Sequence, residues 1–313
     1  MIAATPRSIL TQALAWLREG HGVVLATLTG FEGNTSRAVG TFMAVAAHGA
    51  TCGSISSGCL EDAITAEALE VMRAGHGHVT RYGTGSPYID IRLPCGGGID
   101  LLYTPLDDAD LLDGILTDLD RRRPAFLHLS TQGSGRYGVS GEGSFTLPLM
   151  PDLRLVLFGQ GEEFQALARL GTQFGARIDA FSPLIGDILT LQAQDIPSTR
   201  LISTTQRPGV EGDPWSAVVF LFHERDWEDA LLPAALALPS FYHGAVGSAR
   251  THAGRLDRLA AQSVAPDLIA RLQGRIGLIP STRDPASLAL SILAQIVQIH
   301  ATLTLPVHEE AAA

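Results

Sequence analysis

The chain of 313 residues is long enough for two domains, and its 46% of hydrophobic residues can fill ordinary globular cores. The formal net charge of −10 argues against nucleic acid or an anionic membrane surface as the main partner. All 22 basic residues are arginine, which excludes Schiff-base chemistry on lysine and leaves guanidinium groups to bind phosphate or carboxylate.

The cysteines, Cys52, Cys59 and Cys95, form neither a disulfide framework nor a strong zinc-binding pattern. An odd number of cysteines without such spacing is typical of a reducing compartment. No basic segment followed by an apolar stretch opens the chain, and no apolar run reaches the roughly 18 residues of a membrane span. We therefore expect a cytoplasmic protein that does not bind membranes.

Taken in chain order, the first 150 residues alternate between helical and strand-like hydrophobic patterns. They end in a stretch rich in glycine and serine, residues 131–150, which is typical of a hairpin edge or a linker. We place a domain boundary near Pro151, so that the first domain spans residues 1–150. The predicted helices are 6–20, 60–72 and 107–120, and the predicted strands are 23–28, 41–46, 99–103 and 126–130.

After this boundary the pattern changes to strand, turn, helix and strand. This order predicts an α/β fold in which an N-terminal α/β domain is followed by a C-terminal Rossmann-like domain with a mostly parallel sheet. The second domain spans residues 151–305, and residues 306–313 form a tail. The predicted strands are 155–158, 177–181 and 217–222, and the predicted helices are 162–174, 248–262, 266–273 and 285–300.

Two short turns each place a lone thiol beside glycine. Gly58 precedes Cys59, and Gly96 and Gly97 follow Cys95. Glycine lets a ligand or another backbone approach the thiol closely. The turns are therefore candidates for holding a reactive or sulfur-bearing ligand, and the alternative is that both cysteines are small buried hydrophobes.

Cys59 comes just before a predicted helix, and a helix N-terminus favours the thiolate form. Glu61 and Asp62 in the first turn of that helix add negative charge near the sulfur. We therefore do not predict an activated nucleophile at Cys59. Cys52 lies in a strand-like stretch, and we interpret it as structural.

The turn Gly159-x-Gly161, between an apolar strand and a helix, is half of a dinucleotide-binding fingerprint. The third small residue is replaced by Phe164, and Ser182 stands where an acidic residue would bind ribose. Glu162–Glu163 occupy the helix start where a pyrophosphate would lie. The turn therefore predicts Rossmann-like architecture but does not predict a working NAD(P) site.

Four further residues have both a binding and a structural interpretation. His223 follows a predicted strand, where ligands bind in such sheets, but it also suits a surface loop. Ser248 and Arg250 open a helix and can form an anion cradle with its free amides, or Ser248 can simply cap the helix. Arg37 lies in a polar loop between strands and can bind an anion, or remain solvated.

These motifs together resemble the XdhC/CoxI family, the maturation factors of xanthine-dehydrogenase-type molybdoenzymes. Single motifs are weak, but their number and order across most of the chain make the resemblance specific. Most departures, such as Ser182 and Gln295, lie in the Rossmann half, whereas Ser57 replaces a glycine in the first cysteine motif. The matching segments are 53–61, 93–97, 157–161, 242–252, 276–278 and 288–294.

The resemblance implies a protein that binds the molybdenum cofactor and assists sulfuration and insertion of that cofactor into a xanthine-dehydrogenase-type apo-enzyme. It also implies a homodimer and a cysteine desulfurase as a further partner. Cys59 and Cys95 would face the cofactor and contact its metal. The other residues assigned to cofactor binding are Gly58, Gly96, Gly97, Arg37, Gly159, Gly161, His223, Ser248 and Arg250.

Two other functions stay open from the sequence. One is an NAD(P)-dependent oxidoreductase that uses the Rossmann-like domain, which a titration with the nicotinamide cofactors would test. The other is a scaffold that docks enzyme subunits with both sites vestigial, which would bind an apo-enzyme and no small molecule.

Overall fold

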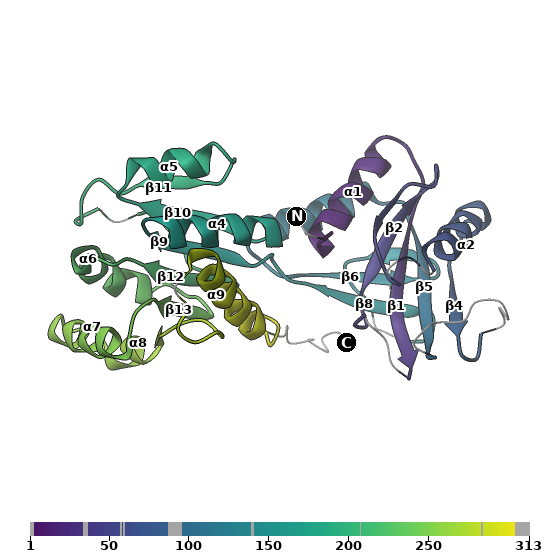
Figure 1. Cartoon of the computed structure of the whole chain (residues 1–313). Helices are drawn as coiled ribbons and strands as arrows, with labels where there is room; N and C mark the ends of the chain where they lie inside the picture. Colours follow the sequence, from purple (N-terminus) through teal and green to yellow (C-terminus); the bar gives the residue numbers. More distant parts are fainter. Residues whose placement is uncertain are drawn as a thin grey trace, which may run out of the picture. The chain divides into compact units, whose positions relative to one another are not determined.

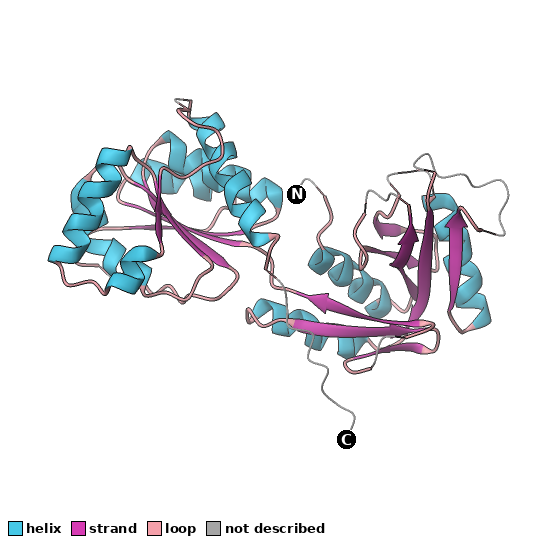
Figure 2. Ribbon diagram, turned by 90° about the horizontal axis from the view of Figure 1, so that it is seen from below, coloured by secondary structure: helices cyan, strands magenta, loops and turns pink. Residues whose placement is uncertain are grey.

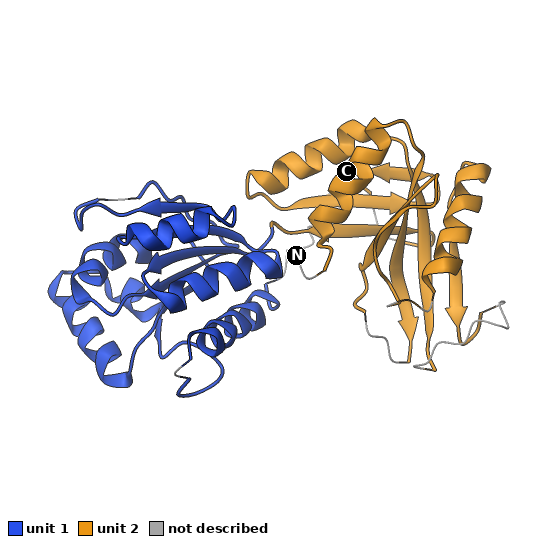
Figure 3. Cartoon of the chain, turned by 45° about the horizontal axis from the view of Figure 1, so that its top comes forward, with its two compact units in different colours: residues 1–2, 152–304 blue, residues 3–151, 305–313 orange. Residues whose placement is uncertain are grey.

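The computed structural model describes residues 3–33, 37–56, 58, 60–86, 96–138, 141–206, 208–282 and 284–303. The chain divides into two compact units at residues 151 and 152 (Figure 3). We call residues 3–151 the N-terminal unit and residues 152–304 the C-terminal unit. No helix in the described ranges is long and apolar enough to cross a membrane.

The N-terminal unit is built on a five-stranded sheet with the order β3-β2-β1-β5-β4, in which every neighbouring pair is antiparallel. A second, three-stranded sheet has the order β7-β6-β8. The elements are α1 (Pro6–Arg18), β1 (Val23–Glu32), β2 (Phe42–Ala46), β3 (Thr51–Gly53), α2 (Glu61–Ala74), β4 (His78–Gly83), β5 (Gly98–Leu106), α3 (Ala109–Asp120), β6 (Ala125–Ser130), β7 (Gly133–Gly135) and β8 (Ser144–Leu149).

The two faces of the five-stranded sheet are covered by different elements, because alternate strand residues point to opposite sides. Val24, Ala26 and Leu28 of β1 pack in one core with Ile64 and other apolar residues of α2. Val23 and Leu25 pack in a second core with α1, α3, β6 and β8. Figure 1 shows α2 on the side of β1 that faces away from α1. The sheet is therefore buried on both faces, and its loops emerge only at its ends.

The stretch rich in glycine and serine forms a hairpin rather than a linker. Ser144–Leu149 pairs with the whole of β6, from Ala125↔Leu149 to Ser130↔Ser144. Leu147 and Leu149 of β8 are buried in the core with α1 and α3. Of the two alternatives for this stretch, burial of these leucines selects the hairpin.

The C-terminal unit contains a six-stranded, fully parallel sheet with the order β11-β10-β9-β12-β13-β14. This is the 3-2-1-4-5-6 order of dinucleotide-binding folds, so the predicted Rossmann-like architecture is confirmed. The elements are β9 (Arg154–Gly159), α4 (Glu162–Phe174), β10 (Arg177–Ser182), α5 (Ile185–Gln192), β11 (Ser198–Arg200), β12 (Ser216–Leu221), α6 (Arg225–Leu236), β13 (Tyr242–Ala245), α7 (Ala249–Ala261), α8 (Pro266–Ala270), β14 (Leu272–Gly274) and α9 (Pro285–His300).

Helices cover both faces of this parallel sheet, as Figure 2 shows. α4 and α9 pack on one face of the central strands, and α6, α7 and α8 pack on the other. Sheets of this kind bind ligands outside the carboxyl ends of their strands, where the strand order reverses. In this unit that point lies beyond β9 and β12.

One predicted helix was wrong at its end. The helix expected over residues 266–273 stops at Ala270, and Leu272–Gly274 forms the edge strand β14 instead. His243 of β13 pairs with Leu272, whose side chain is buried. The tertiary contact with β13 therefore overrides the local helical pattern.

Gly159, the last residue of β9, lies where the β9 backbone meets β12. A Cβ added there would be 2.8 Å from Leu221 Cβ and 2.9 Å from its carbonyl oxygen. We expect Gly159→Ala to lower the free energy of unfolding by about 1–3 kcal/mol, because the added methyl group would overlap Leu221, which is buried in the sheet. Urea denaturation measures this change.

Gly186→Ala is the matched control, since a Cβ on Gly186 of α5 would meet nothing within 4 Å. Alanine favours helix by about 1 kcal/mol over glycine, so this variant should be neutral or slightly more stable. Equal destabilisation by both substitutions would contradict the close approach at Gly159.

Candidate functional site

One end of the five-stranded sheet gathers the strand ends that lead into the predicted binding segments. β1 ends and β5 begins there, with Glu32 opposite Gly98, and β4 ends there with Gly83 opposite Gly98. β3 also ends there, because Gly53 pairs with Met43 at the start of β2. We call this the loop end of the N-terminal unit.

Three segments that carry predicted site residues join strands at the loop end. Arg37 lies in the connection from β1 to β2, Cys59 in the turn after β3, and Cys95 in the segment before β5. Cys59 and Cys95 themselves lie outside the described residues. Strand topology nevertheless joins both cysteine segments to the same end of one sheet, although they are more than 30 positions apart in the sequence.

The glycines after Cys95 lie close to two other backbones. The hydroxyl of Thr84 donates to the carbonyl of Gly96, and the N–H of Thr84 donates to the carbonyl of Gly97, each at 3.0 Å. A Cβ on Gly33, just after β1, would be 3.3 Å from Gly97 Cα. Gly96 has a φ of +68°, which glycine adopts without strain. The positive φ therefore favours glycine at position 96, next to Cys95, and the 3.3 Å contact favours glycine at position 33.

The carboxylate of Glu61, at the first position of α2, organises the turn that contains Cys59. It accepts hydrogen bonds from the Ser54 hydroxyl at 2.7 Å, from the Ser56 N–H at 3.0 Å and from the Gly58 N–H at 2.8 Å. The Ser56 hydroxyl donates to it as well, and the Leu60 N–H lies 3.2 Å from it. The backbone on both sides of Cys59 is therefore held by a single side chain.

These hydrogen bonds keep Glu61 ionised. Burial alone would raise the pKa of this carboxyl, but donation by Ser56, Ser54 and the Gly58 backbone outweighs burial and lowers the pKa to about 2. The sequence predicts Glu61 only as a charge near the thiol, and its role as an acceptor was not predicted. The preceding serines and glycine were the available signal, since they supply donors that a helix-start carboxylate can reach.

Other charges at the loop end are paired. Arg81 of β4 forms an ion pair with Glu32 and contacts Asp100 of β5 at 3.1 Å. Arg37 is partly buried in the connection before β2. In the described part of the chain, no three histidine, cysteine or acidic side chains gather as metal ligands.

The glycine turn of the C-terminal unit donates a hydrogen bond to a carboxylate of α5. The N–H of Gly161 donates to Asp187 Oδ2 at 3.0 Å, and the Ser182 hydroxyl donates to the same oxygen at 2.8 Å. Gln165 donates to Asp187 Oδ1 at 2.6 Å. Asp187 is only 4% exposed. The carboxylate of Asp187 therefore accepts the hydrogen bond from the Gly161 N–H that a bound pyrophosphate would otherwise accept.

The other predicted residues of this unit lie around the carboxyl ends of β12 and β13. His223 is 69% exposed and lies 3.7 Å from Glu163. Ser248 caps α7 by accepting a hydrogen bond from the N–H of Thr251 at 3.1 Å, so the predicted cap is confirmed. Arg250 lies exposed in the first turn of α7. Asp187, whose helix α5 has no strong periodic pattern, was not predicted.

Comparisons with known proteins match a family model to part of each unit. The XdhC Rossmann domain matches residues 155–296, and the XdhC and CoxI family matches residues 16–83. The molybdenum cofactor insertion chaperone PaoD of Escherichia coli (strain K12) is 34% identical over 301 residues, which cover 94% of this chain and 88% of PaoD. This chain belongs to the XdhC and CoxI family. The family predicted from the sequence motifs is thus confirmed.

A solved structure from Bacillus halodurans, described as that of a xanthine dehydrogenase, shares the fold. The two structures have a TM-score of 0.75 at 22% sequence identity, and the match covers 93% of this chain and 95% of that chain.

Glu61→Gln should lower the free energy of unfolding at pH 7 by about 1–2 kcal/mol, because the amide leaves several turn donors without a charged acceptor. The pKa of Glu61 is lowered on folding, so its stabilisation is complete above pH 5 and is lost as the pH falls toward 2. The stability gap between the native protein and the variant should therefore shrink between pH 5 and pH 3.

Asp62→Asn is the matched control, because Asp62 is the neighbouring exposed carboxylate in the same helix turn. Denaturant unfolding at pH 7, 5 and 3 compares the variants. A gap for Glu61→Gln that equals the gap for Asp62→Asn, or that does not depend on pH, would contradict the role of Glu61 as the central acceptor.

Proposed function

We propose that this protein is a molybdenum-cofactor chaperone that holds the cofactor as cargo and assists its sulfuration and insertion into a xanthine-dehydrogenase-type apo-enzyme. The relationship to PaoD over 94% of the chain supports this function. The observation that carries the proposal is the loop end, where one sheet end joins the segments of Cys59, Cys95 and Arg37.

The residues of the loop end suit the chemistry of this cargo. Thiols at Cys59 and Cys95 are soft ligands for molybdenum and its sulfur atoms. Gly58, Gly96 and Gly97 let the ligand approach the backbone, and the guanidinium of Arg37 suits the phosphate of the pterin.

Glu61 supports binding of the cargo rather than attack on it. Its ionised carboxylate lies within the turn that carries Cys59, and a negative charge nearby disfavours the thiolate. Because the thiolate is the form that binds metal, a thiol that is not strongly acidified is a weaker ligand, which suits a chaperone that must release its cargo. A homodimer and contact with a cysteine desulfurase belong to the same proposal.

The C-terminal unit does not favour the alternative of an NAD(P)-dependent oxidoreductase. Asp187 accepts hydrogen bonds from the Gly161 N–H and the Ser182 hydroxyl. Ser182 also stands where an acidic residue would bind ribose. A dinucleotide phosphate would have to displace this buried carboxylate. Gly159 and Gly161 therefore serve the fold in this proposal, and nicotinamide binding is expected to be absent at micromolar concentrations.

The test is anaerobic purification of the full chain, followed by fluorescence detection of oxidised pterin and quantification of molybdenum in the same sample. We expect pterin and molybdenum together, and at least about a tenfold loss of both in Cys59→Ser and in Cys95→Ser, as expected for removal of a metal ligand. Cys52→Ser is the control, because Cys52 packs partly buried against the core beside α1.

Loss of pterin in Cys52→Ser alone, or retention of pterin in both loop-end variants, would contradict the assignment of the thiols. Tight binding of an apo-molybdoenzyme by a protein that holds no pterin would instead support a scaffold. Micromolar binding of NAD(H) or NADP(H) would restore the oxidoreductase.

A further inference from the structure

A cavity of about 1240 Å³ lies at the carboxyl ends of the parallel strands in the C-terminal unit. Its walls come from the end of β12, the turn between β13 and α7, the segment after β14, and Glu163 at the start of α4. This is the position where such sheets bind ligands, and pockets for small molecules usually measure about 300–1000 Å³. The cavity therefore has room for a ligand of at least nucleotide size.

The polar groups of this cavity favour an anion at one place. Arg275 lines the cavity, is exposed, and forms no hydrogen bond or ion pair with any residue that the structure describes. Ser248 and Ala249 line it as well, at the positive N-terminal end of α7. The acidic and imidazole side chains on the wall are Glu163 and its neighbour His223, 3.7 Å apart.

The remaining wall is apolar and open to solvent. Leu278 and Ile279 are each 50% exposed, and Pro280 and Leu288 continue the same surface. Apolar side chains that gather beside polar groups in a cavity are typical of a binding site. A flat ring can cover this surface while a charged group attached to it reaches Arg275.

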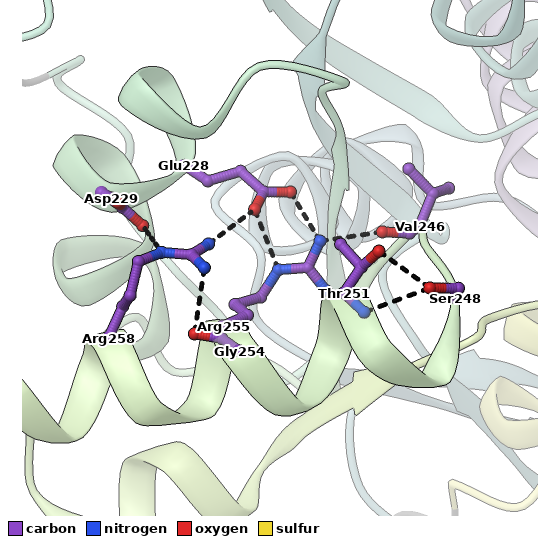
Figure 4. Close-up of polar contacts among 8 residues, drawn as sticks. All are labelled: Glu228, Asp229, Val246, Ser248, Thr251, Gly254, Arg255 and Arg258. Atoms are coloured by element: carbon purple, nitrogen blue, oxygen red, sulfur yellow. Dashed lines mark hydrogen bonds and ion pairs between the residues drawn. The ribbon is translucent and has the colours of Figure 1, made fainter.

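Buried contacts hold the walls of the cavity in place (Figure 4). Arg255 and Glu228, whose side chains are 1% and 4% exposed, form a 2.6 Å ion pair between α7 and α6. Arg255 also donates to the carbonyl of Val246 at 2.8 Å, which fixes the turn before α7. Its Nη1 is buried and has no hydrogen-bond partner among the described residues, so one donor beneath this turn is unused.

The segment after β14 is tied to α9 in the same way. The N–H of Gly277 donates to Gln295 Oε1 at 2.6 Å, and the N–H of Ile279 donates to the Ser291 hydroxyl at 2.7 Å. Both sides of the cavity are therefore preformed, which reduces the entropy lost when a ligand binds.

We propose that this cavity binds a phosphate ester of one flat heterocycle, with the phosphate at Arg275 and the start of α7 and the ring on Leu278 and Ile279. At the glycine turn beyond β9, where the second half of a dinucleotide would lie, the Gly161 N–H already donates to Asp187. The ligand is therefore a single phosphorylated ring. A pterin phosphate and a mononucleotide share this chemistry. The choice of the pterin rests on the proposed function, and with that choice Arg275, and not Arg37, holds the phosphate of the cargo.

The test is calorimetric titration of the full chain with 6-hydroxymethylpterin phosphate, its unphosphorylated form, GMP and inorganic phosphate. We expect the phosphorylated rings to bind at least about tenfold more tightly than the unphosphorylated pterin or inorganic phosphate, because ring and phosphate use separate parts of the wall. Tighter binding of the pterin phosphate than of GMP assigns the cavity to the cofactor, and the reverse order assigns it to a nucleotide.

Two variants locate the binding. Arg275→Gln should weaken the phosphorylated rings by about tenfold and leave the unphosphorylated pterin unchanged, because it removes the charged donor. Ala249→Trp places a bulky side chain on the exposed cavity wall and should abolish binding of every ring. The controls are Arg177→Gln at the amino end of β10, and Ala260→Trp on the exposed surface of α7, far from its start.

Equal affinity for phosphorylated and unphosphorylated pterin, or binding that Ala249→Trp does not reduce, would overturn the proposal. The result is independent of the purification experiment. Binding in this cavity by a protein that purifies without molybdenum would overturn the chaperone and leave the cavity assignment standing.

Discussion

Backbone N–H groups that leave the regular hydrogen bonding of a strand or helix need an acceptor, and two carboxylates meet this need at the most important turns of the chain. Glu61 collects the donors of the turn that contains Cys59, and Asp187 collects those of the glycine turn after β9. Unpaired donors at such places cost about 1–3 kcal/mol each when buried. The two turns are therefore ordered by the chain itself before any ligand arrives.

The same kind of contact has opposite consequences for binding in the two units. At the loop end, Glu61 accepts from the Gly58 N–H, and Gly58 itself is exposed. In the C-terminal unit, Asp187 occupies the amide that would face a ligand. The proposed ligand therefore lies in the cavity on the other side of the strand-order reversal, where Arg275 has no partner among the described residues.

Much of the fold was predictable because its signals are local. Strands with strong apolar runs, such as β9 and β12, and the amphipathic helix α4 follow from hydrophobic periodicity alone. The helix α5 and the strand β13 were missed, because each is short and is selected by packing against the sheet. The edge strand β14 was read as helix for the same reason, since only its pairing with β13 defines it.

The candidate site was predictable in composition and not in geometry. The order of the motifs identified the cysteine turns. The hydrogen bonds of Glu61 were not predictable, because they form only when the backbone of residues 54–56 and 58 folds back toward the Glu61 carboxylate. Asp187 is 26 positions after Gly161 and comes from a helix without a clear pattern. The Arg255–Glu228 pair joins two separate helices. Contacts of this range are set by topology, which a single sequence does not state.

Asp187 also competes with any dinucleotide for the N–H of Gly161 in the glycine turn. A tethered carboxylate acts at an effective concentration that is commonly millimolar or higher, whereas a free dinucleotide must pay the full entropy of association. We expect this intramolecular competition to insulate the C-terminal unit from the cellular nicotinamide pool. A fold that commonly binds redox cofactors would then bind another ligand without competition from those cofactors.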